Sequence, residues 1–233
     1  MTTLEPLAYT HAGTPLTGWL ARPAGAPRAA IVIYPTIVNK NPAMERRAAM
    51  LADLGYLAMI VDFYGEPVPD FAAAGPLATA LREDPAHYRA RVAAACQALR
   101  AHAPGLPLGA IGYCMGGQAA LEAARAGEDL FAVASFHGIL STALPAETGA
   151  IRARILVCHG DADPMVPREQ VLEFWQEMDQ AGGRWHFHAY SGVKHGFTDP
   201  GSDARGLPAI AYDASADRQS RRAMTGLFDE ILG

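Results

Sequence analysis

A cysteine near the middle of the chain lies in a context typical of a catalytic nucleophile. Residues 112–116 read Gly-Tyr-Cys-Met-Gly, with a short apolar run at 108–111 before them and an alanine-rich stretch at 118–125 after them. The pattern predicts a buried strand that turns sharply into a helix, where glycines permit a strained backbone and close neighbours. The helix N-terminus favours the thiolate of Cys114, which is the reactive form of cysteine. The segment therefore indicates a nucleophile elbow that carries a thiol.

Two later segments supply an acid and a base. An apolar strand pattern at 154–160 runs into a polar loop that contains Asp161 and Asp163. An alternating strand pattern at 185–190 precedes His195. The motif around the cysteine would by itself suit a small buried residue in a glycine-rich turn equally well. The order nucleophile, acid, histidine, each after a predicted strand, is however that of α/β-hydrolases, and open α/β sheets form their sites at the C-terminal ends of strands.

The chain resembles the dienelactone hydrolase family over most of its length. The resemblance is carried by the apolar strand at 30–34, the segment at 54–65, and the motifs G-Y-C-M-G-G, H-G-D-A-D-P-M-V-P and K-H-G-F. It implies an α/β-hydrolase fold with a triad of Cys114, Asp163 and His195, because the family's acid directly precedes the x-x-V-P stretch. Asp161 is the competing acid, although an aspartate in a loop also suits backbone hydrogen bonding.

Such a triad catalyses acyl transfer through a covalent intermediate. Cys114 attacks a carbonyl, His195 accepts the thiol proton and later activates water, and Asp163 sets the tautomer of the histidine. Two main-chain N–H groups must then stabilise the oxyanion. The elbow geometry makes Met115 one donor, and the resemblance implies Ile37, on the loop after the strand at 30–34, as the other.

Two departures from the family pattern bear on the substrate. Relatives that act on dienelactone carry a glutamate where this chain offers Thr36, and an arginine a few residues past the histidine, where this chain has Asp199. The missing glutamate favours a standing Cys–His pair, and a carboxylate facing the site would repel an anion. We therefore expect a neutral ester or lactone as substrate rather than dienelactone itself. Three arginines could bind an anion instead, but their spacing better suits a solvated helix face: Arg82, Arg89 and Arg91.

Two alternatives to ester hydrolysis stay open. The same nucleophile and oxyanion donors suit activated phosphotriesters, and a non-catalytic binding module could have kept the pocket. Five residues on loops or turns beside the predicted triad are candidates for substrate binding: Thr36, Phe63, Tyr64, Tyr113 and Phe197.

The remaining cysteines and histidines favour structural interpretations. Cys96 and Cys158 lie in apolar patterns and suit the core. His186 and His188 alternate on one strand, but no carboxylate or cysteine nearby completes a ligand set, so we expect neither a metal nor a cofactor. His137 and His159 lie at the ends of predicted strands, where packing is the simpler role.

The composition suits one enzyme domain over residues 1–233. Half of the residues are hydrophobic, and no apolar run is long enough to span a membrane. The chain begins without a secretory signal, and three cysteines without metal-ligand spacing suit reduced thiols, so we expect a cytoplasmic protein. A net charge of −5 excludes a nucleic-acid footprint and a polybasic membrane patch. The expected partner is a small ester or lactone, and no pattern predicts an oligomeric state.

Strands that alternate with helices predict a mostly parallel central sheet flanked by helices. An antiparallel hairpin over 4–10 and 15–21 is expected to open the chain, and a segment rich in Pro, Ala and Gly over 66–76 is expected to be irregular. Further strands are predicted at 57–62 and 132–136, and helices at 44–54, 88–102, 168–180 and 214–232.

Overall fold

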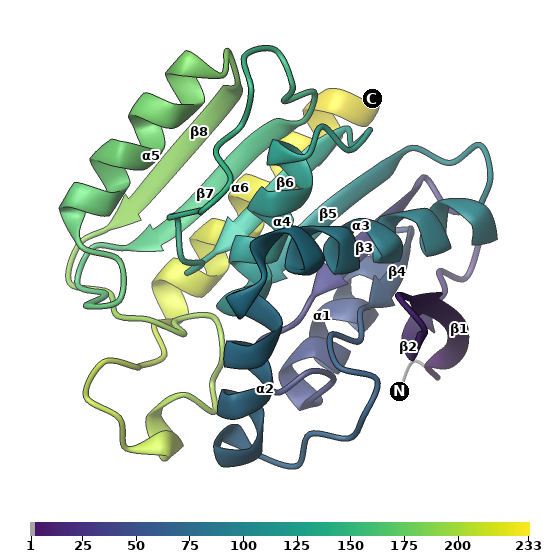
Figure 1. The fold of residues 1–233 in the computed structure, drawn as a ribbon, viewed down its shortest axis with the longest axis horizontal. Coiled ribbons are helices and arrows are strands. Elements are labelled where there is room, and N and C mark those ends of the chain that lie inside the picture. Colours follow the sequence, from purple (N-terminus) through teal and green to yellow (C-terminus); the bar gives the residue numbers. More distant parts are fainter. Residues whose placement is uncertain (1–2) are drawn as a thin grey trace.

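One eight-stranded sheet forms the centre of the protein (Figure 1). The computed structural model describes residues 3–233. The strand order is β1-β2-β4-β3-β5-β6-β7-β8. The strands are β1 (Glu5–His11), β2 (Thr14–Ala21), β3 (Ala29–Tyr34), β4 (Tyr56–Ile60), β5 (Leu108–Tyr113), β6 (Ala132–Phe136), β7 (Arg154–Gly160) and β8 (Arg184–Tyr190).

The expected opening hairpin and mostly parallel sheet are both confirmed. β1 pairs antiparallel with β2, and β2 pairs antiparallel with β4. All later neighbours pair in parallel, from β4 through to β8. Every residue of β3, β4, β5 and β6 is buried, because helices cover both faces of these strands. This burial explains why their sequences are continuous apolar runs rather than alternating ones.

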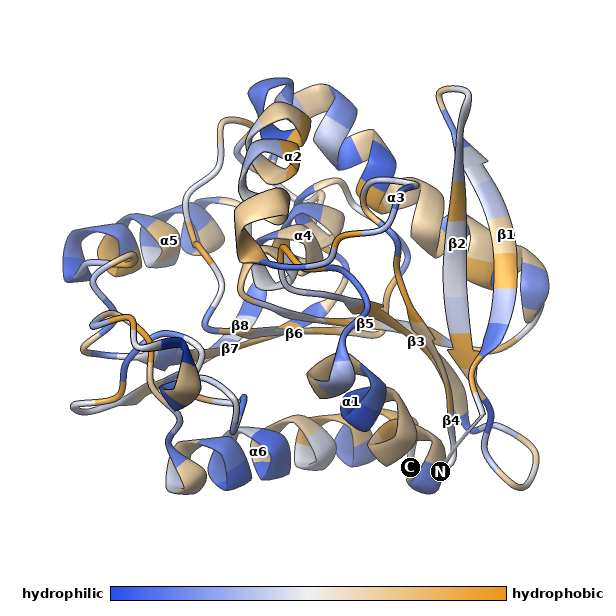
Figure 2. Ribbon diagram, turned by 90° about the horizontal axis from the view of Figure 1, so that it is seen from below, coloured by the Kyte–Doolittle hydropathy of each residue, from blue (hydrophilic) through white to orange (hydrophobic). Residues whose placement is uncertain are grey.

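Helices cover the two faces of the sheet unequally, as Figure 2 shows. On one face lie α1 (Pro42–Asp53) and α6 (Ala214–Leu232). The apolar side of α1 and Phe228 of α6 are buried against this face of the sheet. On the other face lie α2 (Phe71–Glu83), α3 (Pro85–His102), α4 (Met115–Arg125) and α5 (Arg168–Gln180). A short 3-10 helix, η1 (Asp203–Arg205), interrupts the long connection between β8 and α6. No helix in residues 3–233 is long and apolar enough to cross a membrane.

The segment at 66–76 differs from the irregular structure expected, because α2 begins within it at Phe71. The carboxylate of Asp70 accepts the N–H of Ala73 at 2.9 Å and so caps the helix. Pro76 lies inside the helix, where its missing N–H costs a hydrogen bond. Burial of Ala78 and Leu81 against the core offsets that cost. Proline is a strong local signal against a helix, and here tertiary packing outweighs it.

The parallel register brings several strand ends to one edge of the sheet. Cys114 follows β5 directly, and His137 follows β6 directly. The pairing of Tyr113 with Phe136 makes these two residues neighbours across the sheet. The loops after β3, β7 and β8 leave the same edge, so the predicted site residues converge there.

Candidate active site

Cys114 occupies a strained turn between β5 and α4. Its φ is 58° and its ψ is −120°, a left-handed region that side chains rarely adopt. The turn requires glycine on both sides. A Cβ added to Gly112 would lie 1.8 Å from the carbonyl oxygen of Gly116, and one added to Gly116 would lie 1.9 Å from that of Tyr34. The predicted elbow is therefore present, and it holds the N-terminus of α4 against the end of β3.

His195 and Asp163 form a buried pair beside this turn. Nδ1 of His195 lies 2.7 Å from Oδ2 of Asp163, and each residue is only 3% exposed. The other carboxylate oxygen of Asp163 accepts the N–H of Met165 at 2.9 Å. With Nδ1 occupied, Nε2 of His195 is the nitrogen left for chemistry, and it has no direct hydrogen-bond partner within residues 3–233.

Cys114 and His195 lie close enough to shift each other's pKa. Burial by itself would raise the pKa of the Cys114 thiol, but the charge of the nearby His195 and the backbone N–H of Met115 lower it. Burial would lower the pKa of His195, but the charge of Cys114 and the bond to Asp163 raise it to about 10. Both shifts favour a thiolate–imidazolium pair over two neutral groups.

Asp161, the competing acid, points elsewhere. Its carboxylate forms a two-pronged ion pair with Arg168, at 2.7 and 3.0 Å. The side chain of Arg168 is 78% exposed, so this pair lies at the surface. Asp163 is thus the aspartate that contacts His195.

The two expected oxyanion donors lie on segments that meet at the elbow. Met115 is the first residue of α4, and Ile37 lies on the loop between β3 and α1. The hydroxyl of Tyr64 donates to the carbonyl oxygen of Ile37 at 3.0 Å and lies 3.8 Å from Sδ of Met115. Tyr64 was expected to line the substrate pocket, and its contacts instead connect the two donor segments.

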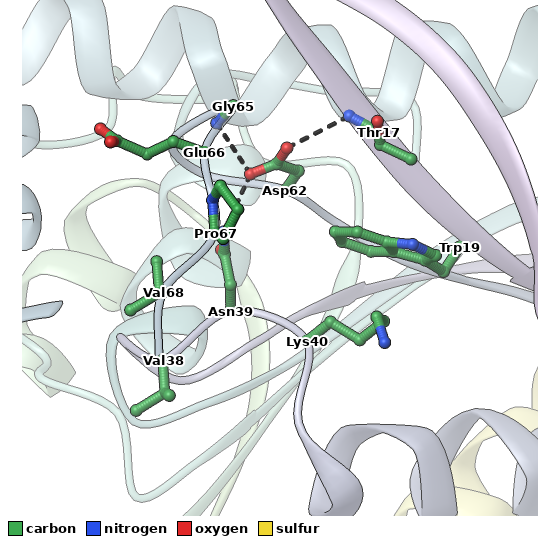
Figure 3. Close-up of a pocket in the computed structure, with 10 residues that line it drawn as sticks. All are labelled: Thr17, Trp19, Val38, Asn39, Lys40, Asp62, Gly65, Glu66, Pro67 and Val68. Carbon is green, nitrogen blue, oxygen red and sulfur yellow. Dashed lines mark hydrogen bonds between the residues drawn. The ribbon is translucent and has the colours of Figure 1, made fainter. Parts of the chain in front are cut away.

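The loop that carries Ile37 is also fixed by a hydrogen bond between two buried polar residues, Asn39 and Asp62 (Figure 3). Nδ2 of Asn39 donates to Oδ1 of Asp62 at 2.8 Å, and Oδ2 of Asp62 accepts the N–H of Thr17 at 3.2 Å. A surface cavity of about 360 Å³ lies beside them, with Trp19 on its wall. Sequence reasoning did not find Asn39 or Asp62. The signal available was a lone aspartate at the end of the apolar strand predicted at 57–62, where an unpaired carboxylate would be costly.

A second cavity, of about 140 Å³, opens onto Cys114 and His195. Its wall includes two of the five expected substrate-binding residues, Thr36 and Tyr113. The rest of the wall is mainly apolar and includes Ile37, Ala43, Met44, Phe71, Met165 and Ile210.

The expectation that Phe63 and Phe197 line this cavity is wrong. Both side chains are fully buried in the core. Phe63 stacks on Tyr34, with 6.3 Å between ring centroids, and Phe197 packs edge-on against His137 at 5.2 Å. Loop position suggested a wall role, but these loops fold back onto the sheet and bury their aromatic rings.

Charged groups on the cavity wall differ from expectation as well. Asp199 does line the cavity, but its carboxylate is paired with Arg205, which lines the cavity too. The helix arginines bind elsewhere: Arg89 pairs with Glu122, and Arg91 contacts His11. Arg205 was not anticipated, because a residue in a long connection carries no periodic signal of its position.

His137 contributes an unanticipated contact to Cys114. Its Nδ1 accepts the backbone N–H of Cys114 at 3.1 Å, and its Nε2 lies 2.9 Å from Oγ1 of Thr198. Burial and the nearby charge of His195 lower the pKa of His137 far below its usual value, so the ring is neutral. Because the N–H of Cys114 can only donate, the proton of His137 resides on Nε2 and is donated to Thr198. Within residues 3–233, no three His, Cys, Asp or Glu side chains converge as a metal-ligating group.

A family model now connects this geometry to known proteins. The model of the dienelactone hydrolase family matches residues 16–232. The chain belongs to the dienelactone hydrolase family. The expected resemblance, the α/β-hydrolase fold and the assignment as a hydrolase are thereby confirmed.

Individual members of the family and of its fold agree with this assignment. A dienelactone hydrolase-like promiscuous phosphotriesterase from metagenomic libraries is 35% identical, with a TM-score of 0.92 over 100% of this chain and 99% of that one. A probable 2-oxo-3-(5-oxofuran-2-ylidene)propanoate lactonase of Bradyrhizobium is 30% identical over 200 residues, which cover 80% of each chain. A dienelactone hydrolase-like structure from Klebsiella pneumoniae is 17% identical, covers 98% of this chain and 99% of its own, and has a TM-score of 0.81, which shows the shared fold.

Proposed function

We propose that this dienelactone hydrolase family member hydrolyses carboxylic esters or lactones through a thioester on Cys114. The observation that carries the proposal is the buried contact between His195 and Asp163 at 2.7 Å, next to a cysteine held at a strained elbow. A buried carboxylate that orients a histidine beside a nucleophile is the arrangement of acyl-transfer enzymes. The relationship to a probable lactonase supports the substrate class.

The first half of the reaction consumes the thiolate. Cys114 attacks the carbonyl carbon, and the carbonyl oxygen becomes an oxyanion that the N–H groups of Ile37 and Met115 would stabilise. When the tetrahedral intermediate collapses, the C–O bond to the leaving alcohol breaks, and His195 donates its proton to that oxygen. The products of this half are the alcohol and the Cys114 thioester.

The second half follows from the change of charge. Acylation removes the negative charge of Cys114, which is the largest of the effects that raise the pKa of His195. Loss of that charge lowers the pKa of His195, so after it has given its proton to the alcohol the ring stays neutral and its Nε2 is free to accept a proton from water. The hydroxide attacks the thioester, the C–S bond breaks, and the acid leaves with regeneration of the thiolate and the imidazolium.

We further propose that neutral substrates are favoured. Thr36 replaces the glutamate found in dienelactone-cleaving relatives, and its hydroxyl is used by the loop itself, since it lies 3.3 Å from Nδ2 of Asn41. The cavity wall beside it is mainly apolar. An apolar wall with few polar groups suits esters whose acyl or alcohol portion is uncharged.

Activated phosphotriesters are a second candidate class. The specific support is the 35% identity to a promiscuous phosphotriesterase that matches the whole chain. The same thiolate would displace the leaving group at phosphorus, and the same N–H donors would stabilise the phosphoryl oxygen.

A substrate panel with one variant tests these proposals. We expect 4-nitrophenyl butyrate and neutral lactones to be hydrolysed, with Cys114→Ala abolishing turnover of both. Paraoxon turnover that also depends on Cys114 would add the second class. Failure of the wild-type protein to hydrolyse any ester or lactone, despite binding them, would favour a non-catalytic binding module.

A further inference from the structure

An arginine and an aspartate face each other on the wall of the catalytic cavity. Nη2 of Arg205 lies 2.5 Å from Oδ2 of Asp199, and both residues line the cavity with Cys114 and His195. Their side chains are 27% and 21% exposed, so the pair borders the space a substrate would enter rather than open solvent.

The guanidinium is held on a second side by an aromatic ring. Its central carbon lies 4.7 Å from the ring centroid of Phe71, the first residue of α2. A guanidinium against a ring face is attracted to it and loses freedom to move. Arg205 thus has a defined position at the cavity, set by Asp199 and Phe71 together.

Asp199 is equally constrained, by the turn that follows the histidine. Its Oδ1 accepts the N–H of Gly201 at 3.0 Å, and its carbonyl oxygen accepts the N–H of Ser202 at 2.9 Å. Oδ1 therefore accepts a hydrogen bond within the turn, and Oδ2 accepts one from Arg205. An asparagine in its place could keep the first bond through its own Oδ1 while losing the negative charge.

The charges of Asp199 and Arg205 cancel, so the two residues add no net charge to the cavity wall, but the guanidinium still offers hydrogen-bond donors. Among the cavity-lining residues within 3–233, Asp199 supplies the single carboxylate and Arg205 the single guanidinium. A guanidinium has five N–H donors. Asp199 accepts a hydrogen bond from one of them, on Nη2 of Arg205. Donors remain for an oxygen of a bound substrate, while the carboxylate cancels the attraction that a free arginine would exert on an anion.

We infer that the Asp199–Arg205 pair is a specificity determinant, which selects neutral esters that carry an accepting oxygen over esters that carry a carboxylate. The inference rests on the ester hydrolysis proposed above and assigns its charge preference to two residues. Asp199 was expected from sequence to repel anions by itself. In the structure its charge is balanced, so removal of either partner should shift the preference, and in opposite directions.

Two matched substrates measure this preference. 4-Nitrophenyl methyl adipate and 4-nitrophenyl hydrogen adipate share a leaving group and nearly the same length, and differ in one negative charge at neutral pH. The readout is the ratio of kcat/KM for the anionic ester to kcat/KM for the neutral one. A general loss of stability or of catalytic power cancels in this ratio.

We expect opposite shifts in the two single variants. Asp199→Asn should raise the ratio about tenfold, which corresponds to about 1.4 kcal/mol, because the guanidinium is then free to attract the carboxylate. Arg205→Gln should lower the ratio by a similar factor, because the carboxylate of Asp199 is then unbalanced. The double variant should return towards the wild-type ratio, and 1 M KCl should reduce both shifts by screening.

Arg168→Gln is the matched control, because it removes an exposed arginine that does not line the cavity. It should leave the ratio unchanged. Circular dichroism establishes folding, and Arg205→Gln tests the inference independently if Asp199→Asn does not fold.

The possible failures are distinguishable. If the wild-type protein hydrolyses both esters through Cys114 but neither single variant changes the ratio by more than about twofold, the inference is overturned and the proposed function stands. The same holds if both variants shift the ratio in one direction. If the wild-type protein hydrolyses neither ester nor any other in the panel, the proposed function fails.

Discussion

The backbone N–H of Cys114 is shared between Nδ1 of His137 and the carbonyl oxygen of Phe136, each 3.1 Å away. The two residues are neighbours because β5 and β6 pair in register up to the residues just before them. His137 also contacts Thr198, three positions after His195, so one neutral imidazole connects the turn at Cys114 to the loop that carries His195. Its backbone has a φ of 42°, a conformation that is costly for a residue with a side chain.

Replacement of His137 should therefore impair catalysis more than substrate binding. We expect His137→Phe to lower kcat for 4-nitrophenyl butyrate by about 10- to 100-fold, because small displacements of catalytic groups have effects of this size. KM should change much less, because His137 is only 3% exposed and its ring contacts Cys114 and Thr198. His137→Asn is the matched control for backbone strain, because asparagine tolerates positive φ. Equal kcat values for the Phe variant and the wild type would contradict a positioning role.

Alkylation should distinguish Cys114 from the other two cysteines. Burial raises the pKa of Cys96 and of Cys158 to about 12, whereas that of Cys114 is lowered. Iodoacetamide at neutral pH should therefore modify one residue per chain, and loss of esterase activity should follow the extent of modification. Peptide mass spectrometry identifies the site. Modification of Cys96 or Cys158 ahead of Cys114 would be inconsistent with the assigned nucleophile.

The two loop aspartates should differ sharply when neutralised. Asp163→Asn should reduce kcat by about 10⁴-fold, because the amide no longer holds His195 in the required tautomer. Asp161→Asn removes only the exposed pair with Arg168 and should leave kcat within about threefold of the wild-type value. Steady-state kinetics on one neutral ester measures both. The reverse ranking would assign the acid to Asp161.

The pH dependence of thiol reactivity should reflect the thiolate–imidazolium pair. The lowered pKa of Cys114 means that the thiolate forms as pH rises through a value below that of an ordinary cysteine, about 8.5. The raised pKa of His195, to about 10, means that the proton for the leaving alcohol is retained until the pH passes that value. Alkylation should thus already be fast at neutral pH, and ester hydrolysis should decline above about pH 10. In His195→Gln the alkylation midpoint should move up towards that of a free thiol, and an unchanged midpoint would argue against the pair.

Local sequence patterns were sufficient for the fold and for the main candidates in the site. Continuous apolar runs predicted the buried strands, because strands covered on both faces contain few polar residues. Glycines around Cys114 predicted the elbow, because other side chains collide there. The order of a cysteine after β5, an acidic loop after β7 and a histidine after β8 followed from the same patterns. Each of these signals resides within a few neighbouring residues.

The tertiary structure decided what these residues contact. In the sequence only the family resemblance favoured Asp163 over Asp161, and the loop conformation directs Asp163 to His195 and Asp161 to Arg168. Phe63 is buried in the core. Its position on a loop could not predict this, because a loop position does not reveal which way an aromatic ring points.

The charge of the cavity and the contacts that support Cys114 likewise depend on three-dimensional structure. Asp199 acquires its partner only because η1 folds Arg205 back over the cavity against Phe71 of α2. His137 reaches Cys114 only through the register of β5 and β6. Burial is encoded locally by side-chain polarity and period, whereas contacts between distant segments depend on how strands and loops are placed by the whole chain.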